Sequence, residues 1–178
     1  MKAIIPVVSS TAPVSAGRRR ALVIASSLVL AGCGFELRQA PSFAFKTIYI
    51  GSAPGSSLGK ELKRNIASDS VKVVNAPTPE LAQVILDILT DQREKVVVGL
   101  STSGQVREFQ LRTRLRFRLR TPQGKELIPE TELLQQRDIS FTESAALAKE
   151  SEEALLYRDM QTDLVQQLMR RLAAVKTI

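Results

Sequence analysis

Apolar and polar residues alternate along residues 105–120, which is the pattern of a strand buried on one side only. Successive strand side chains point to opposite faces, so one face is apolar and the other is rich in arginine. The apolar face carries Phe109, Leu111, Thr113, Leu115, Phe117 and Leu119. The opposite face carries Gln110, Arg112, Arg114, Arg116, Arg118 and Arg120.

Two other segments repeat their apolar residues every four positions, as helices do. The first spans residues 57–66, where Ser56 or Ser57 would cap the N-terminus. The second spans residues 144–175 and carries glutamate, arginine, glutamine and aspartate on its other face. Both are amphipathic helices that need an apolar surface to pack against. The repeated positions are Leu58, Leu62 and Ile66 in the first, and Leu156, Met160, Leu164, Leu168 and Leu172 in the second.

Further runs rich in Val, Ile and Leu predict strands at residues 45–50, 71–74, 82–98 and 126–141, with turns at 101–104 and 121–124. This order predicts an α+β fold, with two helices packed on one face of a four-stranded, mostly antiparallel sheet in the order β-α-β-β-β-α. Residues 45–178 are expected to form this single domain.

The N-terminus has the pattern of an export signal. Three arginines at 18–20 precede an apolar run at 21–30, and Leu30-Ala31-Gly32-Cys33 resembles a bacterial lipoprotein lipobox. The apolar run is about half of the roughly 20 residues that span a bilayer. We therefore expect a signal peptide at 1–32, a lipid attached to Cys33 and a tether over residues 33–44.

Removing this leader changes the charge of the chain. It holds four of the 25 basic residues and none of the 18 acidic ones, so the net charge falls from +7 to +3. An exported domain has little contact with nucleic acid, and an anionic lipid or an acidic protein surface is the expected partner. The chain has one cysteine and no histidine, which removes the commonest general base and metal ligand. No catalytic residue, metal or cofactor is expected.

The arginine face has two interpretations. Five arginines spaced about 6.7 Å apart repel one another unless acids on neighbouring strands balance them. In the other interpretation the row binds an acidic partner or a phosphate, because the guanidinium group suits both. The candidate counter-ions are Asp87, Asp91, Glu130, Glu132 and Asp138.

Three short motifs occur in order along the chain. Cys33 is followed at 34–38 by Gly, an aromatic residue, a variable residue, Leu and Arg. Residues 104–110 read Gly-Gln-x-x-Glu-aromatic-Gln, and residues 146–149 read Ala-Leu-Ala-Lys. With these motifs and its order of elements over 33–175, the chain resembles the outer-membrane LPS-assembly lipoprotein family, LptE.

The resemblance implies a protein without enzymatic activity that plugs the LptD β-barrel, helps it assemble and binds lipopolysaccharide (LPS) on its way to the outer leaflet. Its partners would be LptD, LPS and, through N-terminal acyl chains, the membrane. Gly34, in place of Asp, fits an outer-membrane location on the periplasmic side. The alternative is a lipoprotein scaffold of another envelope complex, serving β-barrel assembly or secretion.

The resemblance also implies where LPS binds, in the hairpin before the 105–120 strand and in the Ala-Leu-Ala-Lys segment. Lys149 matches the second of these, whereas residues 100–103 of the hairpin carry no arginine. An antiparallel pair of strands at 105–120 and 126–141 would bring Lys149 near the 101–104 turn. We therefore predict that Lys149 with Arg107 or Arg112 contacts lipid A phosphates. The candidates for a partner-facing strip against the barrel wall are Arg114, Arg116, Arg118 and Arg120.

Overall fold

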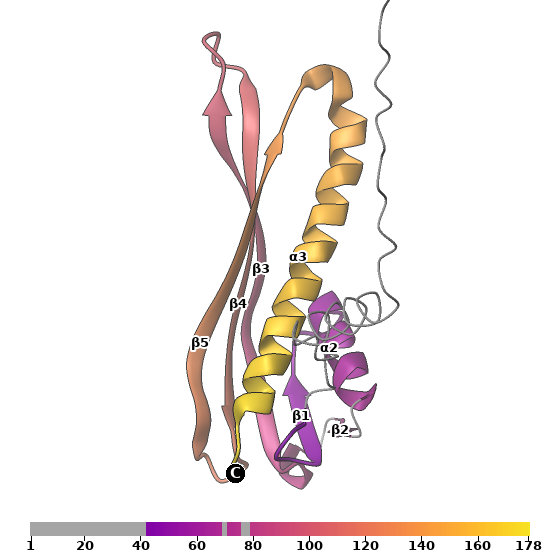
Figure 1. Cartoon of the computed structure of the whole chain (residues 1–178), viewed down its shortest axis with the longest axis vertical. Helices are drawn as coiled ribbons and strands as arrows, with labels where there is room; N and C mark the ends of the chain where they lie inside the picture. The colour runs from indigo at the N-terminus through magenta and orange to yellow at the C-terminus, as the bar shows by residue number, and fades with distance from the viewer. Residues whose placement is uncertain (1–41, 69–70, 76–78) are drawn as a thin grey trace, which may run out of the picture. The chain divides into compact units, whose positions relative to one another are not determined.

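A computed structural model describes residues 42–68, 71–75 and 79–178 (Figure 1). The predicted signal peptide, Cys33 and most of the predicted tether lie outside these residues. The elements are β1 (Thr47–Gly51), α2 (Ser57–Ser68), β2 (Lys72–Val74), a 3-10 turn (Pro79–Leu81), β3 (Val84–Leu100), β4 (Val106–Arg120), β5 (Glu126–Ser140), a second 3-10 turn (Glu143–Ala145) and α3 (Ala146–Ala174).

The sheet has five strands in the order β2-β1-β3-β4-β5. Strands β3, β4 and β5 are antiparallel neighbours, whereas β1 pairs in parallel with both β2 and β3. The predicted α+β class is confirmed. The predicted four-stranded, mostly antiparallel sheet is partly wrong, because the sheet has five strands and two of its four strand pairs are parallel. Helix α2 crosses between β1 and β2 and returns the chain in the same direction, which gives a parallel pair. The run at 71–74, predicted as a strand but not counted in the four-stranded sheet, thereby forms a fifth strand at the sheet edge.

Both helices pack on one face of the sheet, as predicted. Leu58, Leu62 and Ile66 of α2 are fully buried, and so are Leu164 and Leu168 of α3. They belong to a main core cluster that also takes in β1, β3 and β4. A smaller distal cluster lies nearer the start of α3 and consists of Leu111, Ile139, Tyr157 and Met160.

The alternation along β4 is confirmed. Leu111, Leu115, Phe117 and Leu119 are completely buried under the helices, and Thr113 is almost so. The arginines between them lie on the face without helices, and each of the five is at least partly exposed. This face is therefore open along the length of the strand.

A break in the alternation changes the helix-facing side of β3. The pairing with β4 shifts between Ile88 and Thr90, so that Leu89 is an extra residue in the strand. Beyond the shift, Arg93 pairs with Thr113 and Lys95 with Leu111, both of which face the helices. Two cations are thereby placed on the helix-covered face of the sheet.

The turn between β3 and β4 lies at the same end of the domain as the start of α3, as Figure 1 shows. The turn between β4 and β5 lies at the opposite end, near the C-terminus (Figure 1). Among the described residues, no helix is long and apolar enough to cross a membrane.

Candidate functional site

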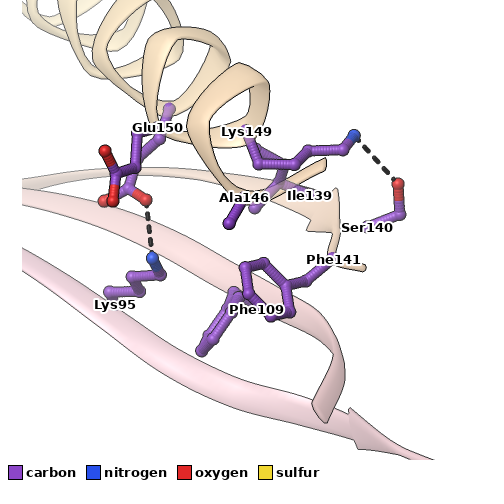
Figure 2. Close-up of a pocket in the computed structure, with 9 residues that line it drawn as sticks. Lys95, Phe109, Ile139, Ser140, Phe141, Ala146, Lys149 and Glu150 are labelled. Carbon is purple, nitrogen blue, oxygen red and sulfur yellow. Dashed lines mark hydrogen bonds and ion pairs between the residues drawn. The ribbon is translucent and has the colours of Figure 1, made fainter. Parts of the chain in front are cut away.

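The end of β5 and the first turns of α3 enclose a hollow of about 240 Å³ at the hairpin end of the domain (Figure 2). Strands β3 and β4 contribute one side chain each to its wall. The residues that line it are Lys95, Phe109, Ile139, Ser140, Phe141, Ala146, Lys149, Glu150 and Glu153.

Two aromatic rings form the apolar part of this hollow. The centroids of Phe109 and Phe141 lie 5.3 Å apart, with an edge-to-face angle of 77°. The Lys95 ammonium lies 4.3 Å from the centroid of Phe109 and 2.7 Å from a carboxylate oxygen of Glu153. Lys95 therefore joins the sheet to α3 by an ion pair and a cation–π contact.

Lys149 lies on the rim of the same hollow. Its Nζ donates hydrogen bonds to Ser140 Oγ at 3.2 Å and to a Glu152 oxygen at 2.8 Å, and its side chain is 22% exposed. Figure 2 shows the bond to Ser140. Lys149 is thus held against the end of β5 rather than extended into solvent, with its charge balanced by a residue one helical turn away.

The structure separates the two arginines proposed to act with Lys149. Arg107 lines a neighbouring hollow of about 330 Å³, together with Thr142 and Glu143 from the connection to α3. Its carbonyl oxygen accepts a hydrogen bond from the Phe141 backbone at 2.8 Å. Arg107 and Lys149 therefore flank one short segment of chain.

Arg112 belongs to a different surface. It lies on the open face of the sheet, where its Nε donates a hydrogen bond to Gln110 Oε1 at 2.7 Å. Arg112 pairs with Gln136, four residues before Ser140 on β5, so it lies about 13 Å along the strand from the residue that holds Lys149. Of the two arginines left open by the sequence, Arg107 is the one near Lys149.

Exposed apolar side chains surround this end of the domain. Leu147, in the first turn of α3, is 82% exposed, and Leu100, at the end of β3, is 62% exposed. Val97 and Val98 are also exposed. Such a concentration of exposed apolar residues next to basic ones is typical of a surface that binds an amphiphile or a partner.

Acids on neighbouring strands balance most of the arginine row. Arg114 is paired with Glu132 at 2.8 Å, and Arg116 with Glu130. Three predicted counter-ions are confirmed: Glu130, Glu132 and Asp87. The balanced interpretation of the row therefore holds for its last four arginines.

Asp87 is shared between two arginines. One carboxylate oxygen accepts hydrogen bonds from Arg118 Nε at 2.9 Å and Arg120 Nε at 2.8 Å. Burial on its own would raise the pKa of Asp87, but these two guanidinium groups outweigh it and lower that pKa below the usual 3.8. The hydrogen bond to Asp87 in turn raises the pKa of Arg120.

The prediction was wrong for the other two counter-ions, Asp91 and Asp138. Asp91 follows the shift at Leu89 and accepts a hydrogen bond from Ser56 at 2.9 Å. Asp138 accepts one from the Gln110 amide at 2.9 Å. Neither contacts an arginine of the row, because the bulge turned Asp91 to the other face and the β5 register placed Asp138 beside an amide.

A polar contact between the two helices was not predicted from the sequence. Gln161 is only 7% exposed, and its Nε2 donates a hydrogen bond to a Glu61 oxygen at 2.6 Å. Its Oε1 accepts hydrogen bonds from Ser57 Oγ at 2.6 Å and from Arg93 at 2.8 Å. A polar residue within the apolar stripe of a helix was the available signal, because a buried amide needs partners.

Within residues 42–68, 71–75 and 79–178, no group of three or more cysteine, aspartate or glutamate side chains is placed to hold a metal ion.

The fold places the chain in a class of small α+β domains that have been solved from bacterial lipoproteins. A solution structure of an uncharacterized lipoprotein B from Nitrosomonas europaea is 39% identical, with a TM-score of 0.68. The similarity covers 79% of this chain and 91% of that one. A rare lipoprotein B from Shewanella oneidensis, 22% identical over 72% of this chain and 94% of its own, shares the fold at a TM-score of 0.61.

Residues 45–172 match the LptE family, described as lipopolysaccharide-assembly. The chain therefore belongs to the LptE family of LPS-assembly lipoproteins, and the resemblance read from the sequence motifs is confirmed. The LPS-assembly lipoprotein LptE of Pectobacterium atrosepticum is 26% identical over 151 residues, which cover 83% of this chain and 80% of that protein. The LptE of Yersinia enterocolitica is 28% identical over 151 residues, covering 83% and 72%.

Proposed function

We propose that this protein is exported, cleaved before Cys33 and anchored by acyl chains to the periplasmic side of the outer membrane. Residues 1–32 are then the signal peptide, and residues 33–44 tether a single domain, 45–178. The lipobox pattern and membership of the family support this proposal. Stable anchoring requires more than one acyl chain, which a lipoprotein modification of Cys33 supplies.

The proposed protein partner is the LptD β-barrel, which this domain plugs and helps to assemble without making or breaking a bond. The open face of the sheet supports this proposal, because the interior of a large β-barrel is polar. The paired arginines and acids along this face offer both hydrogen-bond donors and hydrogen-bond acceptors, and their charges largely cancel. The proposed barrel-facing strip consists of Arg114, Arg116, Arg118 and Arg120 with their acidic partners.

The proposed lipid ligand is LPS, bound at the hairpin end during its delivery to the outer leaflet. The observation that carries this proposal is the position of Lys149 between an apolar hollow and the exposed Leu147. A lipid A phosphate would take the place of Glu152 on Lys149, with Arg107 as a second cation. The acyl chains would lie against Leu100 and Leu147. Charge-assisted hydrogen bonds to phosphate are stronger than neutral ones.

The variant Lys149→Glu tests the lipid site, with Lys125→Glu as the matched control. Lys125 is exposed in the β4–β5 turn, at the opposite end of the domain. We expect the LPS that co-purifies with Lys149→Glu to fall about tenfold, because a charge-assisted bond is replaced by repulsion. Equal LPS on Lys149→Glu and Lys125→Glu would refute the site.

A pull-down from membranes with the tagged chain tests the barrel proposal. We expect LptD to co-elute in a ratio near one to one. Recovery of a different envelope complex in place of LptD would refute it, and would favour a scaffold role in barrel assembly or secretion.

A further inference from the structure

A third hollow, of about 410 Å³, lies between α2 and α3. It contains no apolar side chain, and its lining includes three cations. Arg158 lies nine residues beyond Lys149, which is about 14 Å along the helix. The hollow is thus separate from the apolar one at the hairpin end. Its residues are Ser57, Lys60, Glu61, Arg64, Arg158, Gln161 and Thr162.

The one carboxylate that lines this hollow, Glu61, accepts hydrogen bonds from two uncharged donors. One oxygen of Glu61 accepts a hydrogen bond from the buried Gln161 amide at 2.6 Å. The other accepts one from Thr162 Oγ1 at 3.0 Å. Each oxygen has a further lone pair, so Glu61 can still accept bonds from a ligand. The buried amide fixes this edge of the hollow across both helices.

The three cations that line the hollow are not paired with acidic side chains. In the part of the chain that the structure describes, Lys60, Arg64 and Arg158 are not in an ion pair. Lys60 and Arg64 are four residues apart on α2, and so lie on one side of the helix. Like charges placed this way repel one another. An anion bound between the helices would relieve that repulsion.

We infer that this hollow binds an anionic sugar, a saccharide that carries a phosphate or a carboxylate. The two guanidinium groups suit either anion. Glu61, Ser57 and Thr162 supply hydrogen-bonding oxygens for sugar hydroxyls. None of the residues that line the hollow is apolar, which disfavours an acyl chain. The inference rests on the proposed function, since it assigns the polar, sugar part of LPS to the groove between the helices.

A titration of the full-length chain in detergent with glucose 1-phosphate, followed by amide chemical shifts, tests the inference. Glucose and inorganic phosphate are the comparison probes. We expect the sugar phosphate to shift the amides of Lys60, Arg64 and Arg158. Inorganic phosphate should bind about tenfold more weakly, because it lacks the hydroxyl contacts, and glucose should not bind.

The double variant R64Q/R158Q should weaken glucose 1-phosphate binding at least tenfold, because it removes two charge-assisted contacts. R170Q/R171Q, which changes two exposed arginines near the end of α3, is the matched control and should bind normally. The altered side chains are exposed and lie outside the core, so both variants should keep the thermal unfolding temperature of the parent chain.

Three results would overturn the inference. R64Q/R158Q could bind glucose 1-phosphate as tightly as the parent, inorganic phosphate could bind equally well, or an acidic peptide such as tetraglutamate could bind more tightly. LPS co-purification with Lys149→Glu separates the two proposals. A failed titration with LPS still dependent on Lys149 refutes only the sugar site. A successful titration with LPS unaffected by Lys149→Glu refutes only the hairpin-end site.

Discussion

Replacing Asp87 by asparagine tests whether the arginine row is stabilised from within the sheet. The Asp87 carboxylate is the common acceptor for Arg118 and Arg120, at 2.9 and 2.8 Å. Asparagine keeps the shape of the side chain but removes its charge. Both guanidinium groups would then lie close together without an anion.

The expected loss of stability follows from the exposure of the three groups. The side chain of Asp87 is 19% exposed, that of Arg120 30% and that of Arg118 41%. Solvent therefore screens the pair of Asp87 with Arg118 more than the pair of Asp87 with Arg120. Partly exposed pairs each contribute up to about 1 kcal/mol, and the two together about 1–2 kcal/mol. For a domain of this size, that loss lowers the midpoint of thermal unfolding by about 3–7 °C.

The dependence on pH gives the sharper measurement. The folded pKa of Asp87 lies below 3.8, so its stabilisation is present above that pH and is lost as the pH falls through the folded pKa. The gap in unfolding midpoint between parent and Asp87→Asn should therefore be constant near neutrality and close progressively below pH 4. Calorimetry from pH 7 to pH 2.5 follows it.

Asp138→Asn is the control, because Asp138 contacts an amide instead of an arginine. It should change the midpoint by less than about 2 °C. The reasoning is refuted if Asp87→Asn unfolds with the parent at pH 7. It is equally refuted if the gap does not narrow as the pH falls from 4 to 2.5.

Three further predictions concern the packing of the helices. Leu115→Ala, in the middle of β4, should cost about 2–5 kcal/mol in urea unfolding, because Leu115 is completely buried; a loss under 1 kcal/mol would contradict the assigned core. Tyr157→Phe removes a 2.7 Å hydrogen bond to the Glu94 carbonyl and should cost about 1 kcal/mol. Burial raises the pKa of Tyr157, and the charge of Glu153 raises it further, while Arg93 opposes the shift. The parent should therefore lose stability as the pH rises past 10, whereas Tyr157→Phe should not. Parallel curves of stability against pH for the two proteins would contradict this prediction. Gln161→Leu should cost about 1–3 kcal/mol and speed amide exchange in α2, and unchanged exchange would show that the buried amide does not join the helices.

The sequence predicted the half-buried strand well, because one period governs all of β4. Leu111, Leu115, Phe117 and Leu119 are buried as the alternation requires. The two amphipathic helices followed for the same reason, since an apolar stripe has to be covered. Such patterns are local, and they were correct wherever the backbone kept a single period.

The β3 bulge was not predictable, and its effects extend beyond its own residue. The positions before Leu89 suggested one phase, but Arg93 and Lys95 follow the opposite phase. The place of Lys95 in the wall of the candidate site was missed for this reason. No turn residue marks the shift in the sequence, because the bulge is fixed by pairing with β4 rather than by local chemistry.

The pairing of distant segments could be predicted from the sequence only in part. Lys149 and Arg107 are 42 positions apart, and only the path of β5 brings them to one end. Arg112 was an equal candidate until the faces of the sheet were assigned. The fifth strand likewise depends on β1 having a free edge, which is a property of the folded sheet.

The unequal sizes of the two apolar clusters give α3 a gradient of local stability. Its C-terminal half packs through Leu164, Leu168 and Leu172 into the main core cluster, and its middle packs through Tyr157 and Met160 into the small distal cluster. The first turns, residues 146–153, contribute no side chain to either cluster. Segments with few apolar contacts open at low free energy while the rest of a protein stays folded. The first turns of α3 therefore form a separate opening unit. Amide protection should rise steadily along the helix, and the end next to Leu147 should fray while the remainder stays docked.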